Sequence, residues 1–158
     1  MDTHSEARRF VDTYTPLIMR LGYSYLRSRE DAEDLCQETL IKLVRHGGGF
    51  SDAEHEKAWV VRVAINACKD RLKSADRNRV VGLDSVAEPT AAEDEGGGAV
   101  LEAVQGLPQA YREAIYLHYG EGYKIAEVAE LTGKSEAAVA KTLSRGRAML
   151  RTMLGGEF

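Results

Sequence analysis

The sequence has few cysteines, prolines and aromatic residues, and it lacks long apolar runs. Its 158 residues include 2 cysteines, 3 prolines and 7% aromatic residues. No apolar run approaches the roughly 20 residues that a membrane-spanning helix needs. The N-terminus MDTHSEARRFVD also lacks the apolar stretch of a secretory signal. We therefore expect a protein that stays in the cytoplasm and does not insert into a membrane.

The cysteines and histidines exclude two further classes. Cys36 and Cys68 are too few for a disulfide framework and are not spaced as CxxC. The four histidines are scattered, with no HExxH pattern. We expect both cysteines to be buried as small apolar residues, and we expect no metal and no cofactor.

The net charge of −4 argues at first against nucleic-acid binding, which depends on clustered positive charge. The charges are unevenly distributed, however. Residues 1–79 carry 14 basic and 13 acidic side chains, and residues 106–158 carry seven and six. Residues 80–105 carry six acidic side chains and no basic one. The negative excess therefore lies in the middle of the chain.

This middle stretch has the composition of a linker. It reads VGLDSVAEPTAAEDEGGGA, with a proline, three consecutive glycines and little apolar periodicity. About 21 residues at roughly 3.3 Å each span at most about 70 Å, comparable with two turns of DNA at about 34 Å each. We expect two small domains, 1–79 and 101–158, joined by a flexible acidic linker at 80–100.

Apolar residues at three- and four-residue steps predict that the fold is all-α. In the first domain we expect a helix over 6–27, in which Pro16 predicts a kink or a division into two helices. A second helix starts at Asp31 and ends at Gly47–Gly49, and a third runs from His55 or Lys57 to Ser74. The expected inner face of the second helix holds Leu35, Thr39 or Leu40, Leu43 and Val44, and that of the third holds mostly Trp59, Val60, Val63, Ala64, Ala67, Cys68 and Leu72.

The second domain contains the pattern of a helix-turn-helix. Leu107-Pro108 opens a helix that extends to about Tyr119. Helices over 125–132 and 135–154 then flank Gly133, whose left-handed conformation ends the first of the pair. Ser135 is expected to cap the second helix. Its buried stripe is expected to hold Val139, Leu143, Gly146, Leu150 and Met153.

The second helix of this pair is suited to DNA. Residues 134–151 hold five basic residues and one acidic residue. A helix in the major groove presents short or polar side chains to the bases and flanking basic side chains to the phosphates. The alternative is an ordinary helical hairpin with a solvated basic face. The turn glycine, the small Ala129 and the apolar spacing together favour DNA binding.

Two helices of the first domain also carry charged faces. In the third helix, Arg62, Asn66, Lys69 and Lys73 share one face, and arginine and asparagine suit the edges of guanine and adenine. The alternative is a solvated charged face.

The second helix carries an acidic cluster over its first turns: Asp31, Glu33, Asp34, Gln37 and Glu38. Carboxylates stabilise a helix N-terminus, and a catalytic pair is conceivable. No histidine, nucleophile or phosphate loop accompanies them, however. A protein-docking surface therefore fits better.

Three segments resemble the bacterial extracytoplasmic-function (ECF) sigma factors. They are REDAEDLCQETLIKLVRH, AWVVRVAINACKDRLKS and LPQAYREAIYLHYGEGYKIAEVAELTGKSEAAVAKTLSRGRAMLR. Their order and spacing agree with the family, and the resemblance covers nearly the whole chain outside the linker and the extreme termini.

The resemblance implies a role for each face. The acidic cluster of the second helix falls where the family grips the clamp coiled coil of core RNA polymerase. Arg62, Asn66, Lys69 and Lys73 fall on the helix that faces the minus-ten element. The connection at 50–57 falls where an unstacked base is captured. The residues placed at the minus-thirty-five element are Lys134, Ser135, Glu136, Ala138, Lys141, Thr142, Arg145 and Arg147.

The chain departs from the family pattern at three places. Lys124 stands where the family often has serine, and Ala140-Lys141-Thr142 stands where a Lys-Ser-Arg run is common. The Gly47–Gly49 stretch is rich in glycine beside the family pattern.

The resulting hypothesis is a promoter-specificity subunit that is not an enzyme. Its expected partners are core RNA polymerase and promoter DNA, and it is expected on the nucleoid when bound to polymerase. An anti-sigma factor stays open as a further partner, because exposed apolar helix faces suit it and polymerase equally. Two alternatives are a DNA-binding regulator that does not engage polymerase and a helical adaptor that binds only proteins. The free chain is expected to bind duplex DNA weakly.

Overall fold

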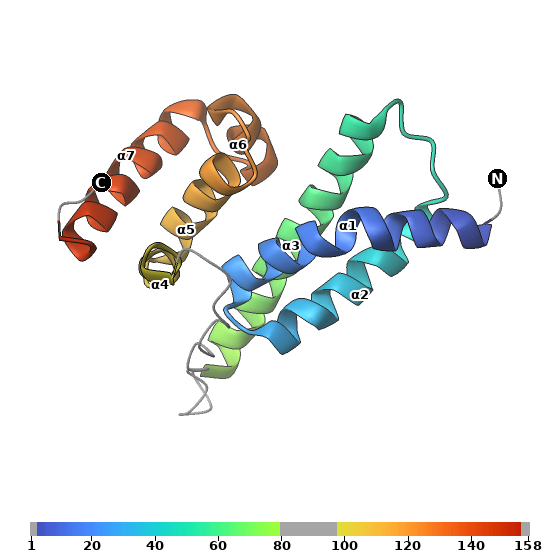
Figure 1. Cartoon of the computed structure of the whole chain (residues 1–158), viewed down its shortest axis with the longest axis horizontal. Helices are drawn as coiled ribbons and strands as arrows, with labels where there is room; N and C mark the ends of the chain where they lie inside the picture. Colours follow the sequence, from blue (N-terminus) through green and yellow to red (C-terminus); the bar gives the residue numbers. More distant parts are fainter. Residues whose placement is uncertain (1–2, 80–97, 156–158) are drawn as a thin grey trace. The chain divides into compact units, whose positions relative to one another are not determined.

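The computed structural model describes residues 3–79 and 98–155, and all regular structure within these ranges is helical (Figure 1). The chain divides between Thr90 and Ala91 into two compact units. The all-α prediction is confirmed. The expected linker lies mostly outside the described residues. Among the described helices, none is long and apolar enough to cross a membrane.

The N-terminal unit is a three-helix domain formed by α1 (Thr3–Leu26), α2 (Arg29–His46) and α3 (Ala53–Arg79). Helix α1 packs along α2 and also against α3. Exposed Pro16 lies inside α1, which continues as one helix, so the division into two helices is wrong. The core is formed by Phe10, Leu17, Ile18, Leu21, Tyr25, Leu35, Leu43, Val60, Val61 and Ile65. Cys36 and Cys68 are buried and unbridged, as expected.

Local signals set both ends of α2. The Ser28 Oγ accepts a hydrogen bond from the backbone N of Asp31 at 3.2 Å, which caps the helix N-terminus. At the other end, Gly47 takes the left-handed conformation with φ of 82°. Gly48 and Gly49 follow with φ of 89° and 86°, so three consecutive residues have positive φ. The predicted end of the helix is confirmed.

Several expectations for the N-terminal unit are corrected. Val44 was expected on the inner face of α2 but is 39% exposed, whereas Leu35, Thr39 and Leu43 of the same helix are buried. Helix α3 starts before His55, since the Asp52 carboxylate accepts from the backbone N of that residue at 2.8 Å. The helix also continues past Ser74 to Arg79. Trp59, Val63 and Leu72 are half-buried rather than core residues.

The C-terminal unit consists of α4 (Gly98–Gln105), α5 (Gln109–Ile115), a π-helical turn η1 (Tyr116–Gly120), α6 (Ile125–Thr132) and α7 (Glu136–Met153). Helix α7 packs against α5, α6 and α4. The core is formed by Leu107, Ala114, Ile115, Leu117, Val128, Ala129, Leu131, Val139, Leu143 and Leu150. Helix α4 begins at Gly98, before the boundary expected at residue 101.

The helix-turn-helix forms as predicted. Gly133 ends α6 with φ of 72°, and the Ser135 Oγ caps α7 by accepting from the backbone N of Ala138 at 3.1 Å. Gly146 is buried against α5, where an added Cβ would lie 2.7 Å from Ile115 Cδ1. The expected burial of Met153 is wrong, because this residue is 48% exposed in the last turn of α7.

Candidate functional site

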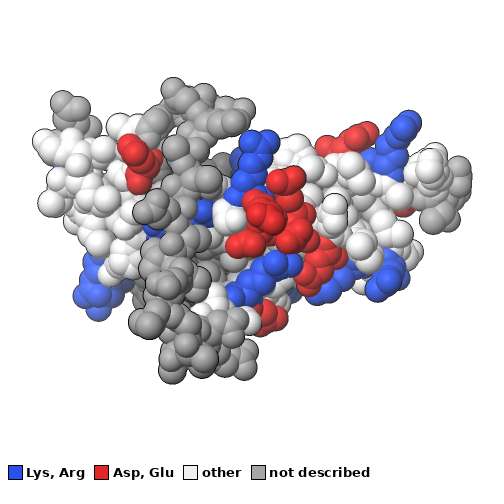
Figure 2. All heavy atoms as spheres, turned by 90° about the horizontal axis from the view of Figure 1, so that it is seen from below, with Lys and Arg blue, Asp and Glu red and all other residues white. Residues whose placement is uncertain are grey.

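Helix α2 separates an apolar inner side from an acidic outer side. Asp31, Glu33, Asp34 and Gln37 are exposed, whereas the intervening Ala32 and the following Leu35 and Cys36 are buried. Figure 2 shows acidic side chains gathered into one patch on this unit, with basic side chains beside it. The structure therefore brings four of the five sequence-predicted docking residues onto one open surface. We call these four residues the acidic patch.

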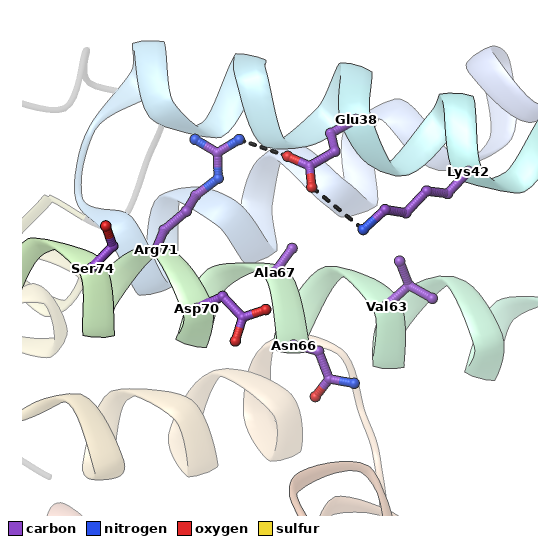
Figure 3. A pocket seen from close by; sticks show the side chains of 8 residues that line it. All are labelled: Glu38, Lys42, Val63, Asn66, Ala67, Asp70, Arg71 and Ser74. Atoms are coloured by element: carbon purple, nitrogen blue, oxygen red, sulfur yellow. Dashed lines mark hydrogen bonds and ion pairs between the residues drawn. The ribbon is translucent and has the colours of Figure 1, made fainter.

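The fifth predicted docking residue, Glu38, is held by a neighbouring helix. Arg71 of α3 donates from Nη2 to Glu38 Oε2 at 2.8 Å, and the Lys42 ammonium lies 3.4 Å from Oε1 (Figure 3). These partners, Arg71 first, lower the pKa of the Glu38 carboxyl. Glu38 therefore links α2 to α3 as well as bordering the acidic patch.

A polar hollow of about 480 Å³ lies beside this link, between α2 and α3. It is lined by Glu38, Lys42, Val63, Asn66, Ala67, Asp70, Arg71 and Ser74. The charges on its wall are mixed, and Asn66 points away from α2 (Figure 3). The hollow adjoins the predicted DNA-binding residue Asn66, so one wall of it belongs to that face of α3.

The four predicted minus-ten residues occupy one face of α3. Arg62, Asn66, Lys69 and Lys73 follow at steps of four, three and four in a continuous helix, which places them within one narrow stripe. Arg62, Asn66 and Lys73 are exposed, and Lys69 is half-buried. The structure thus aligns three cationic side chains and one amide along a single helix face.

An aromatic cluster lies at the connection between α2 and α3. The ring of Phe50 stacks on His46 with centroids 4.6 Å apart and meets the edge of His55 at 5.2 Å. Trp59 lies 4.8 Å from His46 and 5.8 Å from Phe50. The sequence interpretation placed Trp59 in the core and missed His46. The sequence feature that indicates this cluster is the presence of four aromatic or imidazole side chains within fourteen residues.

A buried carboxylate fixes the first turn of α3 against α1. Glu56 is 7% exposed, and its oxygens accept from Arg9 Nη1 and Nη2 at 3.0 and 2.8 Å and from the Tyr14 hydroxyl at 2.6 Å. The arginine is the main cause of the lowered pKa of Glu56. Sequence reasoning missed this cluster, although Glu56 precedes buried Val60 by four residues and so lies on the inner face.

In the C-terminal unit, four of the predicted minus-thirty-five side chains already have intramolecular partners. Ser135 caps α7, and the Thr142 hydroxyl donates to the carbonyl oxygen of Ala138 at 2.8 Å. The Lys134 ammonium lies 3.3 Å from a carboxylate oxygen of buried Glu113, and Arg147 Nη1 donates to the Tyr119 hydroxyl at 2.7 Å. Glu136, Ala138, Lys141 and Arg145 are exposed.

The start of α6 shows how the chain accommodates Lys124. The backbone N of Lys124 donates to Glu127 Oε1 at 2.9 Å, three residues into the helix. This bond satisfies one of the amide groups that a helix N-terminus leaves without a partner. Glu127 therefore accepts from the backbone amide of Lys124, which is a different donor from the one that a serine hydroxyl at this position would cap.

The two units correspond to two sequence families. Residues 10–78 match the Sigma-70 region 2 family and residues 97–150 match the Sigma-70 region 4 family. The chain is also 34% identical over 139 residues to the ECF RNA polymerase sigma factor SigM of Mycobacterium tuberculosis, covering 86% of this chain and 70% of that protein. This chain belongs to the ECF sigma factors.

A second relative supports the same family membership. The RNA polymerase sigma factor CarQ of Myxococcus xanthus is 31% identical over 148 residues, which cover 90% of this chain and 85% of CarQ. Sigma factors are non-enzymatic subunits that bind core RNA polymerase and direct transcription initiation. The expectation that the chain is not an enzyme is confirmed by this family membership.

Solved structures agree with the fold of the sigma factor. One is the sigma factor RpoE of Bartonella quintana, in a co-crystal structure with the anti-sigma factor NepR. It has a TM-score of 0.77 and 23% identity, with 96% of this chain and 98% of that chain covered. Another is CnrH in complex with the cytosolic domain of CnrY, with a TM-score of 0.66 and 21% identity over 98% and 91%.

Proposed function

We propose that the sigma factor docks on core RNA polymerase through the acidic patch of α2. The supporting observation is that Asp31, Glu33, Asp34 and Gln37 are all exposed while the other side of the same helix is buried. Carboxylates on an open surface complement a basic partner surface. Glu38 contributes at the edge of this surface, because Arg71 and Lys42 already neutralise part of its charge.

We further propose that α3 contacts the minus-ten element through Arg62, Asn66, Lys69 and Lys73, and that residues 50–57 capture an unstacked base. The aromatic cluster around Phe50 supports this role, since stacking on aromatic rings helps to offset the cost of removing a base from the duplex. The domain over 1–79 would then open the promoter, with 80–100 as the connection to the second domain.

The domain over 101–158 is proposed to bind the minus-thirty-five element with α7. Support comes from the capped N-terminus of α7, which leaves its first turns exposed next to the turn at Gly133. Lys141, Arg145, Arg147 and Arg151 are exposed basic side chains of this helix, and Arg147 is bonded to Tyr119. The other predicted contacts of this helix are Lys134, Ser135, Glu136, Ala138, Thr142 and Arg147, several of which also position the helix.

We propose that an anti-sigma protein is a further partner, and that the sigma factor acts in the cytoplasm on the nucleoid. One of the matched structures named above is a complex with the anti-sigma factor NepR, and the other is a complex with the cytosolic domain of CnrY. Ile41 and Val44 are 50% and 39% exposed on α2, beside the acidic patch. This mixed surface suits a helical partner that competes with polymerase.

Run-off transcription with purified core polymerase tests the docking proposal. The Asp34→Arg variant is expected to lose core binding, because it places a cation inside the acidic patch. Asp12→Arg is the matched control, since it makes the same change at an exposed position of α1 and should retain binding. Equal core binding by both variants in a co-sedimentation assay would overturn the proposal.

A further inference from the structure

The carboxylate of Glu56 is held from two sides by α1. Its Oε2 accepts from Arg9 Nη2 at 2.8 Å, and its Oε1 accepts from Arg9 Nη1 at 3.0 Å and from the Tyr14 hydroxyl at 2.6 Å. The guanidinium is held in turn by Glu6, whose Oε1 accepts from Arg9 Nη2 at 2.6 Å. A guanidinium that pairs with both oxygens of a carboxylate fixes its direction as well as its distance. The contact therefore restrains the rotation of α3 about its own axis.

The chain that leads into α3 adds little restraint of this kind. Gly48 and Gly49 have positive φ, and a Cβ added at either position would meet nothing within 4 Å. The backbone N of Ser51 donates to His55 Nδ1, and the Asp52 carboxylate accepts from the backbone N of His55. These bonds act within one turn. The Glu56 contacts, in contrast, join this turn to side chains 42 and 47 residues away in the sequence.

The aromatic cluster depends on the position of the same turn. His46 is the last residue of α2, Phe50 lies in the connection, and His55 and Trp59 lie in the first two turns of α3. At about 100° per residue, Glu56 lies about 100° around α3 from His55 and about 60° from Trp59. A rotation that breaks the Glu56 contacts therefore also moves both rings of α3 away from Phe50.

We infer that Arg9, Tyr14 and Glu56 are positioning residues for base capture. They hold the start of α3 so that the rings of the aromatic cluster meet in the arrangement that receives a base. The inference rests on the proposed function, in which this cluster holds an unstacked base of the minus-ten element. A role in stability alone would make a different prediction, because its loss would weaken folding without changing the contact with the base.

Trp59 gives a spectroscopic test, because it is the only tryptophan in the sequence and lies within the aromatic cluster. Glu56→Gln removes the charge that pairs with Arg9. We expect a shifted tryptophan emission and easier quenching by acrylamide in the full-length folded protein. Tyr14→Phe removes one hydrogen bond and should give a smaller change of the same kind. Circular dichroism checks that both variants keep the helix content of wild type.

Ile18→Val is the matched control. Ile18 is a core residue of α1 with 1% exposure, and its loss of one methylene lowers stability by a similar amount without changing a charged group. The tryptophan emission of this variant should match that of wild type. Equal changes in Ile18→Val and Glu56→Gln would overturn the inference, because Trp59 would then report a loss of stability only.

Binding of reconstituted holoenzyme to single-stranded oligonucleotides tests the functional step, since no duplex has to be opened. The oligonucleotides carry the non-template strand of the minus-ten element, and an abasic site is moved through them one position at a time. Wild type and Ile18→Val should lose about tenfold in affinity where the captured base is missing, within the range for one base–aromatic stack. Glu56→Gln should bind the intact strand about tenfold more weakly than wild type and lose nothing further at that position.

The outcomes separate the inference from the proposed function. The inference is overturned if Glu56→Gln and wild type lose the same factor at the same abasic position. It is also overturned if Glu56→Gln loses binding to core polymerase in co-sedimentation, because the variant then acts on the docking surface. A failure of the proposed function looks different, since no position of the abasic site then weakens wild type.

Discussion

The two units of the sigma factor hold their functional helices by different forces. In the N-terminal unit, α3 is tied to α1 through the Glu56–Arg9–Tyr14 cluster and to α2 through Glu38 and Arg71. In the C-terminal unit, α7 packs closely through Gly146 on α5 and is capped by Ser135, and the Lys134–Glu113 ion pair and the bond from Arg147 to Tyr119 lie beside these contacts. The first unit therefore joins its helices by ion pairs at two points, whereas the second adds a close approach of two helices that depends on shape.

This difference determines which conditions disturb which unit. Ion pairs weaken when a carboxylate is protonated or when salt screens the charges. Close packing responds instead to changes in side-chain volume. The N-terminal unit should therefore be the more sensitive to acid, and the C-terminal unit the more sensitive to enlarged residues along α7.

The largest effect is expected from Gly146→Val. A Cβ added at this position would lie 2.7 Å from Ile115 Cδ1, so the two further methyl groups of valine must displace the Ile115 side chain or move α7 away from α5. Overpacking of this kind costs about 1–3 kcal/mol. Denaturant unfolding followed by circular dichroism should show the loss, together with weaker promoter binding. Unchanged stability would mean that shape does not hold α7.

The next effect is expected from Glu56→Gln, which should lower the free energy of unfolding by about 1–2 kcal/mol at neutral pH. The loss is no larger because the Arg9 side chain is 43% exposed and solvent screens its charge. Since folding lowers the pKa of Glu56, its stabilisation is present at neutral pH and is lost as the pH falls through the lowered folded value. Unfolding curves from pH 7 to pH 3 should fall more steeply for wild type than for the variant. Parallel curves would contradict the assignment.

Ser135→Ala should cost about 1 kcal/mol, which is typical for removal of an N-cap hydroxyl. The Ser135 Oγ accepts from the backbone N of Ala138, so its loss frays the first turn of α7, which is proposed to face the promoter. Promoter affinity should decrease, and the loss of stability should be nearly independent of pH. Ser135→Asp is the control that should restore the cap, because aspartate is an equally good N-cap residue.

The smallest effect is expected from Glu38→Gln, which should lower the free energy of unfolding by less than about 1 kcal/mol, because the ion pair with Arg71 is partly solvated. The link between α2 and α3 should matter more for promoter opening than for stability. The double variant Glu38→Arg with Arg71→Glu should recover opening that Glu38→Arg alone loses, as measured by permanganate footprinting. No recovery would indicate that Glu38 acts only as a polymerase contact.

Local signals made much of the C-terminal unit predictable. The first helix of the helix-turn-helix was expected over 125–132 and spans Ile125–Thr132, because Gly133 lies directly beside it in the sequence. The Ser135 cap is equally local. Met153 was misplaced because the apolar period continues past the point where a neighbouring helix covers it.

The ion pairs that join the helices of the N-terminal unit could not be predicted in the same way. Arg9 and Glu56 are 47 residues apart, and no short-range pattern connects them. Arg71 and Glu38 are 33 residues apart, so the docking interpretation treated Glu38 like its exposed neighbours. Periodicity identifies the inner face of a helix, but it does not show which distant charge will meet that face.

The three left-handed glycines after α2 have a consequence for the interpretation of genetic data. Gly47, Gly48 and Gly49 have φ between 82° and 89°, and a Cβ at Gly48 or Gly49 would meet nothing within 4 Å. Most L-residues there cost about 1–2 kcal/mol of backbone strain, with asparagine and aspartate the best tolerated. In a saturation mutagenesis screen, these codons should therefore be intolerant although they are open to solvent. Such intolerance would reflect the path of the backbone and would not by itself identify a binding surface.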